Sequence, residues 1–265
     1  MDDGSPTGAR PWMTVLSWNV HGLPFHNAPL RLTRIAAWVR EHQPDLVLLQ
    51  EVWSSGHLRL LAQAVAGDYE AVSVGGRLGS KPRGGLAVLL RRESAWQPIR
   101  VDFERYQRTA PWYKLNEGDG LAGKGILAVE VRRDDERLLV IDTHLQAGYG
   151  ARRYPEVRRA QLEQLTAFVE RAGRDAPLLI GGDLNTEPDE DLYRDHIAPL
   201  GSDLTEVERR HAGGTCFDAR GKRTEWIDYV LLRGVPARAS LTRIESDAPD
   251  DRYSDHDGLL VRIDR

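Results

Sequence analysis

The chain has 265 residues, of which 41% are hydrophobic and 29% charged, values typical of a globular protein. No apolar run approaches the ~20 residues of a membrane-spanning helix, so we expect no stable membrane insertion. A formal net charge of -4 argues against a tight nucleic-acid binder, which needs many Lys and Arg contacts to phosphates. Cys216 is the only cysteine, which excludes an intrachain disulfide and a cysteine-based metal site.

The beginning of the chain differs in character from the rest. Residues 1–11 are polar and lack the apolar core of a signal peptide, which predicts a flexible tail and a cytoplasmic protein. The length that remains favours one domain over residues 12–265, and we expect a monomer.

The first half of the chain alternates predicted strands and helices. Apolar spacing along residues 31–42 is typical of one helical face, and Pro44 stops that helix. The predicted elements are a strand at 13–18, a helix at 31–42, a strand at 45–50, a helix around 58–65, and strands at 69–74 and 85–90.

The second half repeats this alternation after an irregular segment. Residues 103–123 predict a long loop that carries Trp112 and Tyr113, and residues 205–223, rich in Gly and charge, predict a surface loop. The predicted elements are strands at 124–131, 137–145 and 178–180, helices at 157–172 and 191–197, and strands at 226–232, 237–244 and 259–263. This order predicts an α/β fold in which two mixed sheets pack together with helices outside.

The segment PLLIGGDLNTEP, residues 177–188, is the centre of the functional prediction. A buried strand breaks on Gly181 and Gly182 and then presents Asp183 and Asn185. Two glycines allow a sharp turn and a close approach of another group. Asp and Asn after Gly are also ordinary turn residues, so this segment alone leaves both interpretations open.

Polar side chains stand at the ends of other predicted strands as well. Burying several carboxylates next to apolar runs is costly unless a cation or hydrogen bonds compensate them. Carboxylates and carboxamides without cysteine suit Mg²⁺, and histidines beside such an ion suit phosphoryl chemistry. The residues in question are Asn19, Glu51, Asp142, His144, Asp183, Asn185, Asp228, Asp255 and His256.

The segments SWNVHG, LLQEVW, THLQA, GGDLN, WIDYVLL and SDH, in this order, resemble the endonuclease/exonuclease/phosphatase superfamily, which has the DNase-I-like fold. The resemblance covers nearly the whole chain. It implies a four-layer α/β sandwich with the site at one edge of two packed sheets. It further implies a hydrolase of phosphoric ester bonds that uses Mg²⁺ or Mn²⁺.

The resemblance also implies roles for individual residues. Glu51 and Asn19 match the metal-holding positions, with Asp255 as an accessory metal or water contact. Asp183 matches the carboxylate that activates water, and Asn185 the carboxamide that contacts phosphate. The remaining catalytic positions match His256, the carboxylate Asp228 that orients it, and a second histidine, His144.

The motifs are most similar to the neutral-sphingomyelinase-like branch. THLQA replaces the motif of apurinic endonucleases, and Lys124-Gly125 fits a Lys-Gly pair before a strand, which makes Lys124 a candidate substrate-binding residue. The chain departs from this branch in its short aromatic loop and its lack of a secretion signal. We therefore expect a phosphodiesterase acting on a lipid headgroup or small diester, with a nuclease of the same fold, acting on nucleic acid, as the alternative. A non-catalytic binding module is the third possibility.

Several of these residues also have a purely structural interpretation. Asn19 could close a turn, Glu51 could be a solvated loop charge, and His144 could be a satisfied structural histidine. Asp142 could face solvent or pair with an arginine, and Lys124 could be a solvated turn lysine. Basic clusters at Arg152–Arg153 with Arg158–Arg159 and at Arg220–Arg223 are expected to border the site and meet either a single phosphate or an anionic interface.

Overall fold

The computed structural model describes residues 11–23, 27–72, 82–111, 123–149, 153–173, 176–206, 208–209, 213–218, 220–245 and 253–265. These residues form two six-stranded sheets. Nearly all of the predicted N-terminal tail and both Trp112 and Tyr113 lie outside the described residues.

The first sheet holds the N-terminal strands and the last two strands of the chain, in the order β11-β12-β1-β2-β4-β3. Its one parallel pair, β1 with β2, is connected through helix α1, whereas the other neighbours are antiparallel. The strands are β1 (Met13–Asn19), β2 (Leu46–Gln50), β3 (Tyr69–Val72), β4 (Ala87–Arg91), β11 (Arg238–Ile244) and β12 (Gly258–Asp264).

The second sheet repeats this plan, in the order β5-β6-β7-β8-β10-β9. Its parallel pair, β7 with β8, is connected through helix α4. The strands are β5 (Gln97–Arg105), β6 (Gly125–Arg133), β7 (Glu136–His144), β8 (Leu178–Asp183), β9 (Ser202–Asp203) and β10 (Asp228–Arg233). Each sheet thus carries one β-α-β unit whose two strands end at the same edge.

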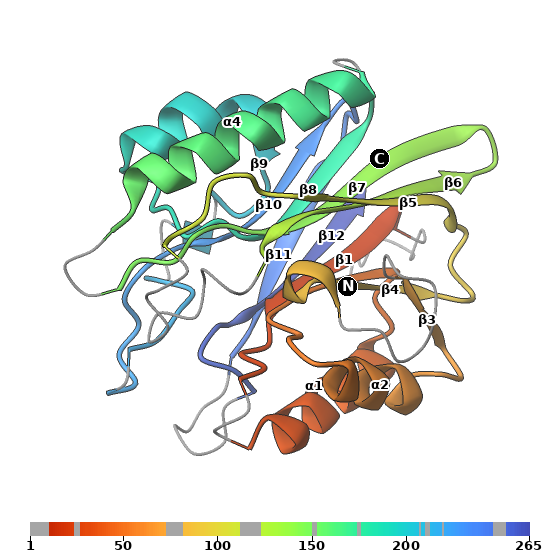
Figure 1. Ribbon diagram of the computed structural model, residues 1–265. Helices are drawn as coiled ribbons and strands as arrows, with labels where there is room; N and C mark the ends of the chain where they lie inside the picture. Colours follow the sequence, from red (N-terminus) through yellow and green to blue (C-terminus); the bar gives the residue numbers. More distant parts are fainter. Residues whose placement is uncertain are drawn as a thin grey trace, which may run out of the picture.

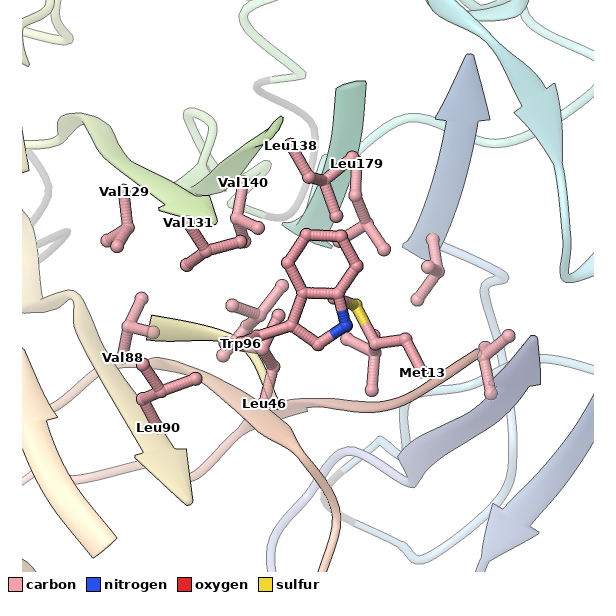
Figure 2. Packing of buried hydrophobic residues seen from close by; sticks show 14 of the residues in the cluster. Met13, Leu46, Val88, Leu90, Trp96, Val129, Val131, Leu138, Val140 and Leu179 are labelled. Carbon is pink, nitrogen blue, oxygen red and sulfur yellow. The ribbon is translucent and has the colours of Figure 1, made fainter. Parts of the chain in front are cut away.

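Helices cover the outer faces of both sheets, which gives four layers (Figure 1). Helices α1 (Ala28–His42) and α2 (Ser55–Ala64) pack on the first sheet, and α4 (Pro155–Ala172) packs on the second. A third apolar cluster fills the space between the sheets, with Trp96 among aliphatic residues of both (Figure 2). The predicted four-layer α/β sandwich is confirmed.

Local sequence explains where the helices begin and which faces they bury. The predicted apolar face of α1 is buried through Leu32, Ile35, Ala36 and Val39. The helix starts earlier than predicted because Pro29 is suited to the first turn, where no backbone N–H is needed. Ser54 caps α2, since its hydroxyl accepts a hydrogen bond of 3.0 Å from the His57 amide. None of the helices in the described part of the chain is long and apolar enough to cross a membrane.

Three segments differ from the predictions. The strand β5 was missed, because this edge strand has a bulge between Pro98 and Arg100, is half exposed, and shows only a short alternation of apolar and polar residues instead of an apolar run. Residues 205–223 are not simply a surface loop, since Thr205 and Thr215 are fully buried. The predicted helix at 191–197 is a short π-helix, Tyr193–Ile197, followed by a 3-10 turn, Ala198–Leu200.

Candidate active site

The ends of the two parallel pairs bring the predicted residues to one edge of the sandwich. Asn19 is the last residue of β1 and pairs in register with Gln50, which immediately precedes Glu51. In the other sheet, His144 ends β7 and pairs with Asp183, which ends β8. Asp228 begins the antiparallel strand β10 opposite Asp183. The carboxyl ends of neighbouring parallel strands lie at the same edge of a sheet, so chain topology alone collects these side chains.

The two glycines before Asp183 are required by the protein's own packing. A Cβ atom on Gly181 would lie 2.5 Å from Leu48 of the other sheet, and one on Gly182 would lie 1.9 Å from the carbonyl oxygen of Thr143. Gly182 also has a φ of 143°, which residues other than glycine rarely adopt. The groups that approach closely are therefore neighbouring strands, and this close packing places Asp183 between the two sheets.

Asp183 is the point where the two halves of the site meet. Its Oδ2 accepts a hydrogen bond of 3.0 Å from Asn19 Nδ2 and lies 3.4 Å from His144 Nε2 and 3.8 Å from His256 Nε2. Its Oδ1 accepts a hydrogen bond of 3.0 Å from the backbone N–H of Asn185. Burial and the charge of Asp228 raise the pKa of Asp183 to about 7, against the opposing effects of His256, Lys124 and Asn19.

His256 is held as a charged imidazole by Asp228. Its Nδ1 lies 2.8 Å from Asp228 Oδ2, and the same oxygen accepts a hydrogen bond of 2.6 Å from Thr215 Oγ1. Burial opposes the charge, but the charges and hydrogen bond of Asp228, together with Asp183 and Asp255, raise the pKa of His256 well above its usual value. The Trp18 indole fixes the backbone by donating a hydrogen bond of 3.0 Å to the His256 carbonyl.

Thr215 is a site residue that sequence reasoning missed. It lies in GGTCF, between glycines and charged residues, where a threonine looks like loop chemistry. Its hydroxyl also accepts the backbone N–H groups of Ile227 and Asp228, at 3.2 and 3.3 Å, so it fixes the start of β10. No local signal in the sequence could have found this contact.

His144 contacts a buried lysine. The Lys124 ammonium lies 2.9 Å from His144 Nε2 and donates a hydrogen bond of 2.7 Å to the carbonyl of Leu145, and only 1% of the lysine is exposed. The same carbonyl accepts a hydrogen bond of 3.2 Å from Asn185 Nδ2. Burial, then the positive charges of Lys124 and His256, hold the pKa of His144 well below its usual value. His144 is therefore neutral, and Lys124 is not a solvated turn lysine.

Glu51 lies on the first-sheet side of the site in a strained conformation. Its φ of 63° places a residue other than glycine in the left-handed region, which proteins retain where function requires it. The half-buried carboxylate accepts two long hydrogen bonds, 3.2 Å from Asn19 Nδ2 and 3.3 Å from Trp53 Nε1. The positive charge of Arg31 interacts electrostatically with both Glu51 and Asp255.

Asp255 lies at the margin of the site. Its Oδ2 is 2.5 Å from His21 Nδ1, and 38% of its side chain is exposed. Burial opposes ionisation, but the hydrogen bond from His21 and the nearby His256 lower the pKa of Asp255 to about 2. Asp255 is thus an ionised carboxylate close to His256.

Two sets of residues can be compared as metal ligands. Among the described residues, donor atoms of Asp183, Asp228 and His256 all lie within 4.8 Å of one another. The hydrogen bond between His256 Nδ1 and Asp228 Oδ2 already uses one donor atom of each of these two residues. In the other set, Glu51 accepts only long hydrogen bonds from neutral groups, whereas Asn19 Oδ1 accepts one of 3.0 Å from the His21 backbone N–H, and both residues offer the oxygen atoms that a hard divalent ion prefers.

Three arginines of the two basic clusters pair with carboxylates of the protein, and Arg152 lies outside the described residues. Arg153 lies 2.7 Å from Glu225, Arg158 is buried and lies 2.9 Å from Glu190, and Arg223 lies 3.1 Å from Asp257. The positive charges of these three arginines are already offset by the carboxylates that they contact. The expectation that they meet a substrate phosphate finds no support in these contacts.

The chain is similar to proteins of one large family. Residues 16–256 match the model of the Endonuclease/Exonuclease/phosphatase family. Sphingomyelin phosphodiesterase 2 of Homo sapiens is 28% identical over 281 residues, which cover 95% of this chain, and the chain spans 64% of that relative's length.

Solved structures share the fold at lower identity. TDP2 of D. rerio, complexed with a single strand DNA product, has a TM-score of 0.73, 18% identity, and coverage of 96% of this chain and 99% of that one. Beta toxin from Staphylococcus aureus, with bound magnesium ions, has a TM-score of 0.68, 16% identity, and coverage of 94% and 99%. Since the family match extends over nearly all of the folded chain, the protein belongs to the Endonuclease/Exonuclease/phosphatase family.

Proposed function

We propose that the protein is a divalent-metal-dependent phosphodiesterase that hydrolyses its substrate by in-line attack of water. The observation that carries this proposal is the position of Asp183, a buried carboxylate within 4 Å of Asn19, His144 and His256. A carboxylate with a pKa raised to about 7 is matched to proton transfer near neutral pH. In this role Asp183 accepts the proton of the attacking water.

His256 and His144 have different charge states in this mechanism. His256, kept charged by Asp228, presents a positive imidazolium towards the negative charge that develops on the phosphate oxygens. His144 stays neutral, and with Lys124 donating to Nε2 its proton resides on Nδ1. Asn185 adds the amide dipole that contacts the phosphate, and Lys124 remains a candidate substrate-binding group through its buried positive charge.

Glu51 and Asn19 would hold the metal ion, with Asp255 as an accessory contact directly or through water. A bound Mg²⁺ or Mn²⁺ supplies positive charge that offsets the charge of the phosphate oxygens. The magnesium ions bound in beta toxin from Staphylococcus aureus support the choice of a hard divalent ion. The hydrogen bond from His21 and the charge of His256 keep that carboxylate ionised, as a metal or water contact requires.

We infer a substrate with a small or lipid-borne headgroup. The similarity to human sphingomyelin phosphodiesterase 2 supports it, as does the net charge of -4. A cavity of about 270 Å³ adjoins Asn185, and its lining holds more carboxylates than arginines. Such a lining suits a small zwitterionic headgroup better than a chain of phosphates. The residues lining the cavity are Gly148, Arg153, Arg158, Asn185, Glu187, Asp189, Glu190, Glu225 and Ile227.

A substrate panel tests this proposal. Purified protein is assayed with Mg²⁺ on bis-p-nitrophenyl phosphate, sphingomyelin micelles, plasmid DNA and single-stranded DNA at equal phosphate, with Asp183→Asn as the inactive control. We expect the diesters with small or lipid-borne headgroups to be hydrolysed with the higher kcat/KM, and at least about 10² loss of kcat in the variant. Faster cleavage of DNA would establish a nuclease instead, which is the alternative that the similarity to TDP2 of D. rerio supports.

A further inference from the structure

A buried polar pair, which the mechanism above does not use, connects the two sheets directly beneath the site. Gln50 Nε2 donates a hydrogen bond of 2.7 Å to Asp142 Oδ1. Both side chains are fully buried, one at the end of β2 and the other in β7. The interpretations in which Asp142 faces solvent or pairs with an arginine are excluded. A polar pair in the middle of an apolar sandwich therefore needs an explanation of its own.

The remaining oxygens of this pair require a proton. Asp142 Oδ2 and Gln50 Oε1 are both buried, and neither has a hydrogen-bond partner. Both are acceptors if Asp142 is ionised, so two acceptors would be left unsatisfied in a dry interior. A proton on Asp142 Oδ2 would turn this oxygen into a donor, and Gln50 Oε1 is the unsatisfied acceptor of the residue that already pairs with Asp142.

The surroundings of Asp142 favour this protonated form. Burial is the largest influence and raises the pKa of Asp142 well above its usual value. The opposing groups are all neutral: the Gln50 side chain first, and then the backbone N–H groups of Leu49 and Ala87, neither of which donates a hydrogen bond to Asp142 Oδ2. No lysine, arginine or histidine is among the described groups that act on this carboxyl.

The pair lies at a position from which it can set the geometry of the site. Gln50 is in register with Asn19 and precedes Glu51, whereas Asp142 lies two residues before His144 on the same face of β7. The metal-holding residues thus belong to one sheet, and His144 and Asp183 to the other. Most of the contact between the sheets is apolar packing, which has no preferred direction, so a directional bond at this point resists sliding of one sheet over the other.

We propose that Gln50 and Asp142 form a neutral acid–amide pair, a positioning unit that holds Glu51 and Asn19 in register with His144 and Asp183. The activity readout of this inference rests on the proposed function, whereas its protonation readout does not. The two residues act through the strands that carry the reacting groups, and neither touches the substrate.

Three variants separate positioning from simple stability. Asp142→Asn keeps both hydrogen bonds, because an amide pairs with an amide in the same way, and it should retain kcat within about twofold. Asp142→Ala breaks the pair, and we expect kcat to fall at least about tenfold, since small displacements of reacting groups are costly. The double variant Gln50→Leu/Asp142→Ala nearly conserves the summed side-chain volume, so it should regain folding stability while kcat stays low.

Val140→Ala is the matched control for this series. Val140 lies on the same strand and face as Asp142, is fully buried, and contacts only the apolar core. This variant should lose stability through a cavity yet keep kcat. If Val140→Ala lost kcat as Asp142→Ala does, or if the double variant regained full activity, the positioning role would be wrong.

The pH dependence of unfolding tests the proton itself, without any substrate. An acid whose pKa is higher in the folded than in the unfolded protein holds its proton longer when folded, so the folded state loses stability as pH rises above about 4. Asp142→Asn should remove this loss, so the ratio of the unfolding constants of the two proteins should change with pH above about 4, by at most about tenfold per pH unit. Identical pH slopes in the two proteins would show that Asp142 is ionised and would overturn the acid–amide pair, whatever the enzyme's substrate.

Discussion

His256 Nδ1 and Asp228 Oδ2 are 2.8 Å apart. This contact joins His256, which lies just before β12 of the first sheet, to the first residue of β10 in the second sheet. The carboxylate fixes which imidazole nitrogen points at Asp183 and stabilises the charged form of the ring. The two residues are therefore coupled by a hydrogen bond and by charge.

We expect Asp228→Asn to lower kcat less than His256→Ala does, because the asparagine still accepts a hydrogen bond from Nδ1. The double variant should be close to His256→Ala alone, since coupled residues do not contribute additively. Steady-state kinetics on the best diester measures this. A double variant showing the product of both single defects would contradict the pairing.

The pH profile of Asp228→Asn provides a second test of the same coupling. Asp228 raises the pKa of both Asp183 and His256, so its neutralisation should lower both values. The mechanism needs Asp183 deprotonated and His256 protonated, so activity rises through the first pKa and falls through the second. Both limbs of the profile of kcat/KM should therefore move to lower pH at saturating Mg²⁺. Limbs that stay in place would show that Asp228 acts only on the geometry.

The hydroxyl group of Thr215 should contribute to activity. Thr215→Val keeps the shape but removes the hydrogen bond of 2.6 Å to Asp228, and we expect a loss of about tenfold in kcat, the value of a hydrogen bond to a charged group. Thr215→Ser keeps the hydroxyl and should restore most of the activity. The two variants are compared by kcat, measured under conditions in which the same fraction of each protein is folded. Equal losses of kcat in both variants would show that the defect comes from packing and not from the hydroxyl.

Lys124 should act on the protonation of His144. Lys124→Met removes a positive charge and a donor at 2.9 Å, so the pKa of His144 should rise. It should remain below the usual value, because burial is the larger cause. Nitrogen chemical shifts of His144 followed over pH measure this change. The exposed Lys222→Met is the control, and the same change in both variants would exclude a local effect.

The fold was predictable because most elements carry periodic apolar patterns. The buried strands β2, β4 and β8 carry continuous apolar runs and β1 is mostly apolar, and the polar residues at the strand ends were visible as Asn19, Glu51 and Asp183. The edge strand β5 was missed although residues 99–104, Ile-Arg-Val-Asp-Phe-Glu, alternate apolar and polar side chains as a half-buried strand does. This short alternation lacks an apolar run, and pairing with β6 completes the strand.

Contacts between distant segments explain what the sequence did not reveal about the site. Thr215 meets Asp228 because residues 213–218 fold against the start of β10, and Lys124 reaches His144 across two neighbouring strands. Asp142 could be placed on the face of His144 by alternation. Its partner Gln50 belongs to the other sheet, and only the packing of the two sheets brings them together.

A divalent metal ion should be essential for activity. Activity should vanish in EDTA and return with Mg²⁺ or Mn²⁺, because Glu51 and Asn19 offer only oxygen ligands and cannot polarise a phosphate by themselves. Glu51→Gln keeps the hydrogen-bond acceptor but removes the charge, so it should raise the Mg²⁺ concentration for half-maximal activity at least about tenfold. Asp255→Asn should raise it less, since this carboxylate is already paired with His21 at 2.5 Å. A titration of Mg²⁺ by activity and by calorimetry measures both variants. Full activity of thoroughly demetallated protein, or a larger effect at Asp255 than at Glu51, would show that the metal is not needed or is held elsewhere.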